Sequence, residues 1–311
     1  MLDFYSQISA LSKKGVSKIG MKFFKKIKSA IKFVLNQIQP KTIIRANIVQ
    51  LAPSELLKGR CALITGGTSG IGFAIAQAFL NAGASVCITG RRESRLNDAR
   101  ERLAKVAGAE RVACVVMDSA DVVSIDAGFE KIITLPLPSK IDILVNNAGV
   151  AKGCFGNMKE ADYDTVLNTN LKGAYFLSQR FANYLKENRS RGNILNICSS
   201  SSLRPANSPY TLSKWGLRGL TLGLAKTLIP HGIVVNGLAP GPTATPMLIK
   251  EEMGGGINLK SNPSGRYATA EEIANAALFL VSDCGRMVVG DVLFMTGGAG
   301  TITFDDMNYS F

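Results

Sequence analysis

Tyr210 and Lys214 are four residues apart in the stretch SPYTLSK, which begins at Ser208. On an α-helix, residues at this spacing share a face, so both side chains can point into one site. A tyrosine phenol releases its proton reluctantly at neutral pH. A lysine cation about 5 Å away, at an effective dielectric of about 20, stabilises a phenolate by roughly 3 kcal/mol. The pair could therefore transfer a proton, although ordinary helix packing is the commoner meaning of this spacing alone.

A glycine-rich turn follows the first apolar run that is typical of a buried strand. The run CALIT (61–65) leads into TGGTSGIG (65–72) and then into a segment of helical periodicity. Glycine lets the backbone approach a pyrophosphate, whose charge the N-terminus of the helix stabilises. The spacing differs from the common G-x-G-x-x-G, and tight strand-to-helix turns use glycine in any case. Its place between strand and helix favours a dinucleotide site over a plain turn. The predicted contacts are Gly66, Thr68, Ser69, Gly70, Ile71 and Gly72.

Two arginines follow the second predicted strand, where many NAD-binding sites carry an acid that binds the ribose hydroxyls. This chain has Gly90, Arg91 and Arg92 there. No carboxylate would repel a 2′-phosphate, and the two guanidiniums could pair with one. The alternative is that both arginines simply face solvent at a helix start. We expect NADP(H) to be the preferred cofactor, with NAD(H) as a second one.

Short apolar runs alternate with segments of helical periodicity from about Lys58 onward. The runs cover residues 61–65, 85–89, 111–117, 141–146, 193–198, 232–238 and 291–296. Continuous apolar runs are typical of parallel strands that are covered on both faces. Strand–helix alternation predicts right-handed βαβ units and a doubly wound, Rossmann-like α/β sheet of about seven strands. We expect one dinucleotide-binding domain over 58–311, preceded by a basic, amphipathic helical extension over 1–57.

Composition excludes several classes of function. The 311 residues suffice for one large α/β domain or two small ones. A single histidine, His231, rules out His-based metal clusters and Ser-His-Asp triads, and no metal site is expected. The six cysteines form no C-x-x-C pair. Buried thiols in a reducing compartment are therefore favoured over disulfides or metal ligands.

The net charge of +13 is concentrated near the N-terminus. Residues 1–50 hold ten Lys or Arg against Asp3 alone, a net charge of +9, which leaves +4 for the other 261 residues. The body of the chain is therefore only weakly basic. We expect no nucleic-acid partner for it.

Taken together, the motifs resemble those of the short-chain dehydrogenase/reductase family. TGGTSGIG is followed in the family's order by NNAG (146–149), NTNLKG (168–173), NICS (196–199), YTLSK (210–214) and PGPTAT (240–245). The resemblance covers about residues 58–311. It is to the compact single-domain branch that includes 3-oxoacyl-carrier-protein reductases and many carbonyl reductases. It implies an oxidoreductase that interconverts a small-molecule carbonyl and a secondary alcohol by hydride transfer.

The resemblance also implies residue roles. The catalytic residues would be Asn170, Ser199, Tyr210 and Lys214. Tyr210 would be the general acid/base, and Ser199 would stabilise charge on the carbonyl oxygen. Lys214 would also bind the nicotinamide ribose, and Asn170 would hold a water that returns the proton. Further cofactor contacts would be Asp118 at the adenine, Asn146 and Gly149 beside the adenosine ribose, and Pro240, Gly241, Thr243 and Thr245 near the nicotinamide. Asn146 and Gly149 would also steady the central sheet.

Two features depart from the family's pattern. Ser199 precedes Tyr210 by 11 residues, two fewer than is commonest, and three more serines follow it directly. Ser199 is preferred because it comes first after the predicted strand. Thr296 stands where the family often has aspartate, far from the catalytic motifs in sequence.

Two other functions stay open. A sugar-nucleotide epimerase or dehydratase of the same superfamily needs a larger C-terminal substrate region, and only about 20 residues separate PGPTATPM from TAEEIANAALFL. A non-catalytic scaffold that keeps the cofactor fold would not need the four catalytic residues. The loop over 247–267 is expected to cover the substrate as a lid.

The helix expected after Lys214 carries two apolar faces. Trp215, Leu222 and Ile229 lie on one face, and Leu217, Leu220, Leu224 and Leu228 lie nearly opposite. A surface helix needs only one apolar face. The second predicts an interface in a homodimer or homotetramer.

Residues 22–38 show an amphipathic pattern, with phenylalanine and isoleucine on one side and lysine on the other. This suits a helix that lies on anionic lipid. Docking of the apolar face on protein is equally favoured, ahead of a disordered basic tail and a cleaved organelle presequence. We therefore expect a cytoplasmic enzyme with peripheral membrane contact through 22–38.

Overall fold

The computed structural model describes residues 27, 29–31, 52–245 and 256–303. The chain divides into two compact units, Met1–Gln50 and Leu51–Phe311. In the first unit the described residues are helical. Most of the amphipathic segment 22–38, and residues 247–255 of the expected lid, lie outside the described residues.

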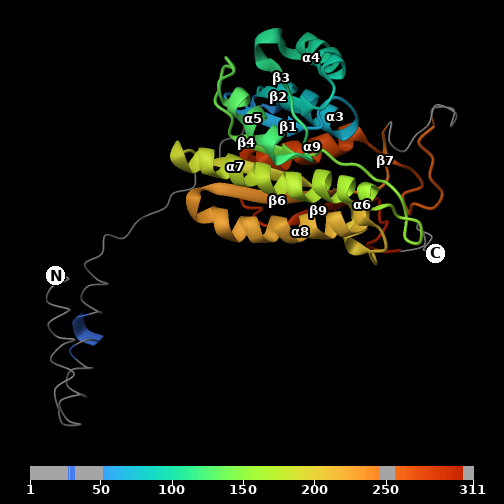
Figure 1. Cartoon of the computed structure of the whole chain (residues 1–311). Coiled ribbons are helices and arrows are strands. Elements are labelled where there is room, and N and C mark those ends of the chain that lie inside the picture. The colour runs from blue at the N-terminus through green and yellow to red at the C-terminus, as the bar shows by residue number, and fades with distance from the viewer. Residues whose placement is uncertain (1–26, 28, 32–51, 246–255, 304–311) are drawn as a thin grey trace. The chain divides into compact units, whose positions relative to one another are not determined.

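A seven-stranded parallel sheet lies at the centre of the second unit (Figure 1). Its strands are β1 (Cys61–Thr65), β2 (Ser85–Gly90), β3 (Val112–Val116), β4 (Ile143–Asn146), β5 (Gly192–Ile197), β6 (Ile233–Pro240) and β9 (Val292–Met295). Their order is β3-β2-β1-β4-β5-β6-β9. The chain moves outward from β1 to β3 and then returns to β4 beside β1. Ligands of such folds bind where the strand order reverses, outside the carboxyl ends of the strands.

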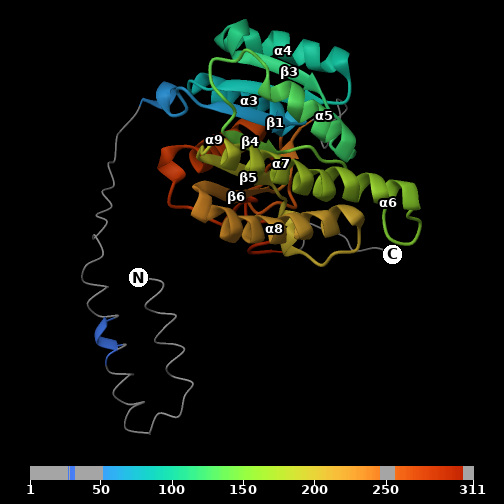
Figure 2. The same ribbon diagram turned by 60° about the vertical axis from the view of Figure 1, so that its left-hand side comes forward.

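Alternating side chains along each strand build one core on either side of the sheet. Ala62 and Ile64 pack into a cluster with helices α3 (Gly70–Asn81), α4 (Glu93–Ala107) and α9 (Ala270–Val281). Cys61 and Leu63 pack into a second cluster with α5 (Val122–Ile133), α7 (Gly173–Glu187) and α8 (Pro209–Leu228). Figure 2 shows these helices around the sheet. Burial on both faces explains why the strands read as continuous apolar runs, and the predicted doubly wound fold is confirmed.

Shorter elements connect this framework. Helix α6 (Glu160–Leu167) continues through a π-helical turn, Asn168–Lys172, into α7. Short 3-10 helices cover Pro53–Glu55, Ala109–Arg111, Ser200–Leu203, Ile229–His231 and Asp283–Gly285. A two-stranded parallel sheet, β7 (Thr243–Ala244) with β8 (Ala268–Thr269), was not predicted. Among the described residues, none of the helices is both long and apolar enough to cross a lipid bilayer.

Candidate active site

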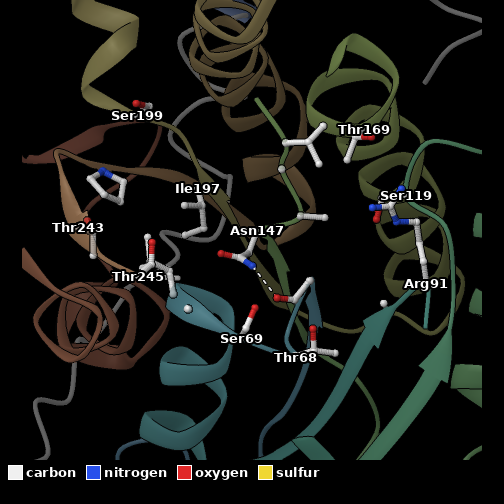
Figure 3. Close-up of a pocket in the computed structure, with 18 of the residues that line it drawn as sticks. Thr68, Ser69, Arg91, Ser119, Asn147, Thr169, Ile197, Ser199, Thr243 and Thr245 are labelled. Carbon is white, nitrogen blue, oxygen red and sulfur yellow. Dashed lines mark hydrogen bonds between the residues drawn. The ribbon is translucent and has the colours of Figure 1, made fainter. Parts of the chain in front are cut away.

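A cleft of about 420 Å³ lies at the carboxyl ends of the strands, around the point where their order reverses (Figure 3). Most of the residues predicted from the motifs line it. These are Gly66, Thr68, Ser69, Gly70, Ile71, Arg91, Arg92, Asp118, Gly149, Ser199, Tyr210, Lys214, Pro240, Gly241, Thr243 and Thr245. Gly72, Asn146 and Asn170 do not line the cleft. The fold therefore brings six separate motifs to one cavity.

The glycine turn between β1 and α3 has a conformation that only glycine adopts readily. Gly66 and Gly70 have φ values of +65° and +56°. A Cβ atom on Gly72 would lie 2.4 Å from Nδ2 of Asn147, so α3 reaches the end of β4 only without a side chain there. The same Nδ2 donates to the carbonyl oxygens of Thr65 at 2.9 Å and Gly66 at 3.2 Å. Asn147 thus braces the turn from inside the cleft (Figure 3).

Asn146 does not line the cleft, but it lies in the central sheet that the resemblance also implied it would steady. It is buried, and its Nδ2 donates to Oγ of Ser178 at 2.9 Å and to Oδ1 of Asn196 at 2.8 Å. Nδ2 of Asn196 in turn donates to Oγ1 of Thr221 at 2.9 Å. This polar chain ties β4, β5, α7 and α8 together, so Asn146 is a residue of the core.

The end of β2 presents a cluster of arginines to the cleft. Arg91, Arg92 and Arg95 all line it and are exposed. A Cβ atom on Gly90 would lie 3.3 Å from Cγ2 of Thr68, in the glycine turn. Asp118, which follows β3, accepts from the backbone N–H of Ala120 at 3.0 Å. The cleft is therefore basic beside β2 and carries a carboxylate after β3.

Lys214 and Tyr210 project from the first turns of α8. Ser208 caps this helix by accepting from the N–H of Thr211, and Pro209 occupies the first position. Lys214 is 4% exposed, and its Nζ donates to the carbonyl oxygen of Ile197 at 2.7 Å. Nζ lies 5.7 Å from the ring centroid of Tyr210. The cation therefore has a fixed place beside the phenol.

Ser199 is the serine of its stretch that faces the cleft. Its Oγ accepts from the backbone N–H of Ser201 at 3.1 Å, which leaves the hydroxyl proton to donate elsewhere. Oγ of Ser200 accepts from Arg204 at 2.9 Å, and Oγ of Ser202 donates to the carbonyl of Ser199 at 2.7 Å. Of the four serines at 199–202, Ser199 alone lines the cleft.

Cys198 also lines the cleft, although no role was predicted for it. Burial raises the pKa of its thiol to about 11, and the nearby Lys214 cation only partly offsets that effect. A neutral thiol is a poor nucleophile. Cys198 is 3% exposed and packs in a hydrophobic cluster with Leu217 and Val292, which indicates a packing role.

Asn170 lies in the π-helical turn and is 1% exposed. Its Nδ2 donates to the carbonyl of Val150 and to Oγ of Ser213, both at 3.0 Å. Its Oδ1 accepts from the N–H of Val150 at 2.8 Å. Both side-chain N–H groups are thus engaged within the protein.

The turn after β6 closes the remaining side of the cleft. Gly241 donates its N–H to the carbonyl of Met295 at 2.9 Å. Thr245 lies close to the glycine turn, because a Cβ atom on Gly70 would be 3.5 Å from its side chain. Thr296, at the position where the family often has aspartate, is buried after β9 and does not line the cleft.

Several residues of the cleft were missed by the sequence predictions. They are Arg95, Met117, Ser119, Asn147, Ala148, Val150, Thr169, Ile197 and Cys198. Five of them lie inside the motifs NNAG, NTNLKG and NICS, so membership of a motif was the available signal. Arg95 could have been found from its spacing of three and four residues after Arg92 and Arg91.

The Rossmann-like sheet with a glycine turn after its first strand is typical of dinucleotide-binding proteins. The short chain dehydrogenase family matches residues 60–254, and the chain belongs to that family. The resemblance inferred from the motifs is thereby confirmed. The protein is an oxidoreductase of alcohol or carbonyl groups, and its relatives bind NAD(H) or NADP(H).

Curated relatives include gluconate 5-dehydrogenase of Gluconobacter oxydans, 36% identical over 248 residues, which are 78% of this chain and 95% of the relative. The 3-oxoacyl-(acyl-carrier-protein) reductase of Aquifex aeolicus is 36% identical over 249 residues, 78% of this chain and 98% of the relative. Among solved structures, the 3-ketoacyl-(acyl-carrier-protein) reductase of Brucella melitensis complexed with NADH has a TM-score of 0.69 and 29% identity, covering 78% and 98% of the two chains. A putative 2-deoxy-D-gluconate 3-dehydrogenase of Agrobacterium tumefaciens with bound NADP has a TM-score of 0.67 and 33% identity, covering 79% and 98%.

Proposed function

We propose that the protein is an NADP(H)-dependent oxidoreductase that interconverts a small-molecule ketone and a secondary alcohol, with Tyr210 as the general acid/base. One observation carries this proposal. Tyr210, Lys214 and Ser199 line the same cleft as the glycine turn, and Lys214 lies beside the phenol ring. A proton donor, a cation and a cofactor cradle thus share one cavity, as hydride transfer to a carbonyl requires.

The residues of the cleft fit a nicotinamide dinucleotide. Gly66 and Gly70 have positive φ angles, and Gly70 has no side chain beside Thr245. The glycine turn therefore leaves a space for the cofactor that Cβ atoms would narrow. The first N–H groups of α3 would hold the pyrophosphate. Asp118 would bind the adenine amino group, and Thr245 the nicotinamide carboxamide. When bound, the nicotinamide supplies or accepts the hydride.

The preference for NADP(H) rests on the charges beside β2. Arg91, Arg92 and Arg95 line the cleft where many NAD-binding proteins carry an acid. Guanidiniums pair with phosphate in a bidentate geometry. Gly90 adds no side chain to the part of the cleft beside β2. These residues together favour a ribose that carries a 2′-phosphate, and NAD(H) would be the weaker cofactor.

The chain's own residues supply the proton chemistry. In the reducing direction the Tyr210 phenol gives its proton to the oxygen of the substrate, and the Lys214 cation stabilises the phenolate that results. The Ser199 hydroxyl, whose oxygen already accepts from Ser201, donates to the same substrate oxygen. The remaining N–H groups of Lys214 bind the hydroxyls of the nicotinamide ribose.

Asn170 has a bracing role in this scheme. Both side-chain N–H groups of Asn170 are engaged by Val150 and Ser213. A water that returns the proton would therefore donate to Oδ1 or to the backbone carbonyl oxygen of Asn170. The π-helical turn supports such a role, because these turns interrupt the regular helical ladder and are frequent at functional sites.

The segment 22–38 is proposed to attach a cytoplasmic enzyme to the surface of anionic membranes. Its lysine-rich face opposite phenylalanine and isoleucine suits that interface. The full chain should co-sediment with anionic liposomes at low salt, whereas a form beginning at Ser54 should stay in the supernatant. If both forms stay in the supernatant, the membrane proposal fails and docking on protein is favoured.

The proposed reaction is tested by following NADPH absorbance with purified protein and a panel of ketones. The panel should include a 3-oxoacyl thioester and a keto-sugar acid, the substrate classes that the names of the relatives suggest. Consumption of NADPH that depends on one class of ketone is expected. No turnover of any carbonyl, or of the corresponding alcohols with NADP⁺, would contradict the proposal.

A further inference from the structure

Ser213 directly precedes Lys214 in the sequence and has no part in the proposed chemistry. Its side chain is 0% exposed, so it does not touch substrate or solvent. Its Oγ donates to the carbonyl oxygen of Tyr210 at 2.7 Å and accepts from Nδ2 of Asn170 at 3.0 Å. One buried hydroxyl therefore joins the backbone of Tyr210 to the side chain of Asn170.

The direction of these hydrogen bonds is fixed by the groups involved. A carbonyl oxygen only accepts, so the single hydroxyl proton of Ser213 is used on Tyr210. The hydroxyl oxygen can then only accept from the side chain of Asn170, which must present its amide nitrogen. The other N–H of that nitrogen donates to the carbonyl of Val150. The orientation of the amide is thus determined from both ends.

Three segments that are far apart in sequence meet at the side chain of Asn170. Val150 follows β4, Asn170 lies in the π-helical turn, and Ser213 lies in the first turns of α8. Because Asn170 is 1% exposed, water does not compete for these bonds. Val150 also lines the cleft. The network therefore fixes the first turns of α8 relative to the segment that follows β4.

We propose that Ser213 is a positioning residue, which holds the backbone of Tyr210 to Asn170 and so sets the place of the Tyr210 phenol in the cleft. This inference rests on the proposed function, in which the phenol transfers the proton. A misplacement of about 1 Å at such a group can lower the rate by about 100-fold. Loss of the hydroxyl should therefore act on turnover and not on cofactor binding.

Thr221 offers a matched control two turns further along α8. Its side chain is also 0% exposed, accepts from an asparagine Nδ2 at 2.9 Å and donates to a backbone carbonyl, that of Leu217, at 2.8 Å. Ser213→Ala and Thr221→Val thus remove the same kind of buried bridge. The two bridges differ in the carbonyl they hold, which is that of Tyr210 for Ser213 and that of Leu217 for Thr221.

The experiment compares kcat, the Kd for NADPH and the melting temperature of the wild type, Ser213→Ala, Ser213→Thr and Thr221→Val. Ser213→Ala should lower kcat by about ten- to a hundredfold, with Kd and melting temperature close to those of Thr221→Val. Ser213→Thr keeps the hydroxyl and should recover most of the rate.

Three results would overturn the inference. Ser213→Ala with a kcat equal to that of Thr221→Val would show that the bridge does not position Tyr210. If Ser213→Ala weakens NADPH binding or lowers the melting temperature much more than Thr221→Val does, Ser213 is a purely structural residue. Ser213→Thr as slow as Ser213→Ala would show that the hydroxyl is not what matters. Failure of the wild type to turn over any carbonyl overturns the proposed function itself, and this inference with it.

Discussion

The Nζ atom of Lys214 lies 2.7 Å from the carbonyl oxygen of Ile197, the last residue of β5. The sheet therefore fixes the cation of α8 directly, beside the ring of Tyr210. A side chain held in this way loses little further freedom when it binds a ligand. Lys214 is thus oriented before the cofactor arrives.

Replacing Lys214 by methionine should impair both catalysis and cofactor binding. Loss of roughly 3 kcal/mol of phenolate stabilisation corresponds to a fall in kcat/KM of about 100-fold. The Kd for NADPH should also rise, because the ribose loses its donor. Steady-state kinetics and fluorescence titration with NADPH measure the two effects. Lys226→Met, at an exposed position of the same helix, is the control and should change neither kcat/KM nor the Kd for NADPH. A Lys214→Met enzyme with wild-type activity would contradict the role assigned to Lys214.

Gly90→Asp should move the cofactor preference from NADPH towards NADH. The added carboxylate would repel the 2′-phosphate and bind ribose hydroxyls. The new Cβ atom meets Cγ2 of Thr68 at 3.3 Å, which requires only a small adjustment. We expect the NADPH/NADH ratio of kcat/KM to fall by about tenfold or more, equivalent to ~1.4 kcal/mol.

Arg91→Ala should raise the KM for NADPH and leave that for NADH nearly unchanged. Arg102→Ala is its control, because Arg102 stacks on Phe73 and does not line the cleft. A wild-type enzyme that uses NADH as well as NADPH would contradict the preference that both variants are designed to test.

The outer face of α8 predicts self-association. Leu222 is 52% exposed, and Trp215 and Ile229 lie exposed on the same face. Leu217, on the opposite face, is buried in the core. Light scattering should give the wild type two or four times the chain mass of 33.2 kDa. Leu222→Glu should shift the protein towards the monomer, whereas Val123→Glu, at an apolar residue of α5 that is 75% exposed, should not. A monomeric wild type at micromolar concentration would refute this prediction.

The strands could be predicted because burial on both faces leaves continuous apolar runs in the sequence. The predicted run 141–146 begins two residues before β4, where the Asp142 side chain pairs with Arg60 and accepts from the N–H of Cys61. The pair β7–β8 was missed, since strands of two residues have no periodicity to detect. Local pattern thus located the sheet, whereas tertiary contacts decided where its strands begin.

The site could be predicted where its residues form contiguous motifs. The roles of Asn146 and Asn147 depended instead on side-chain alternation at the end of β4. Asn146 still belongs to the strand and points into the core, whereas the next residue turns towards the glycine loop. The motif NNAG contains both asparagines but does not say which one faces the cleft. The hydrogen bond between Ser213 and Asn170 likewise depends on the π-helical turn, which no local sequence pattern predicted.

The central claim is that Tyr210 transfers the proton, and Tyr210→Phe tests it most directly. The phenylalanine ring keeps the packing of the tyrosine ring beside Lys214 and removes only the hydroxyl. With the best ketone of the panel, turnover should fall to about one per cent of the wild-type rate or less, while the Kd for NADPH stays within about twofold. A variant that binds NADPH normally and keeps more than about ten per cent of the wild-type rate would contradict the assignment of Tyr210 as the general acid.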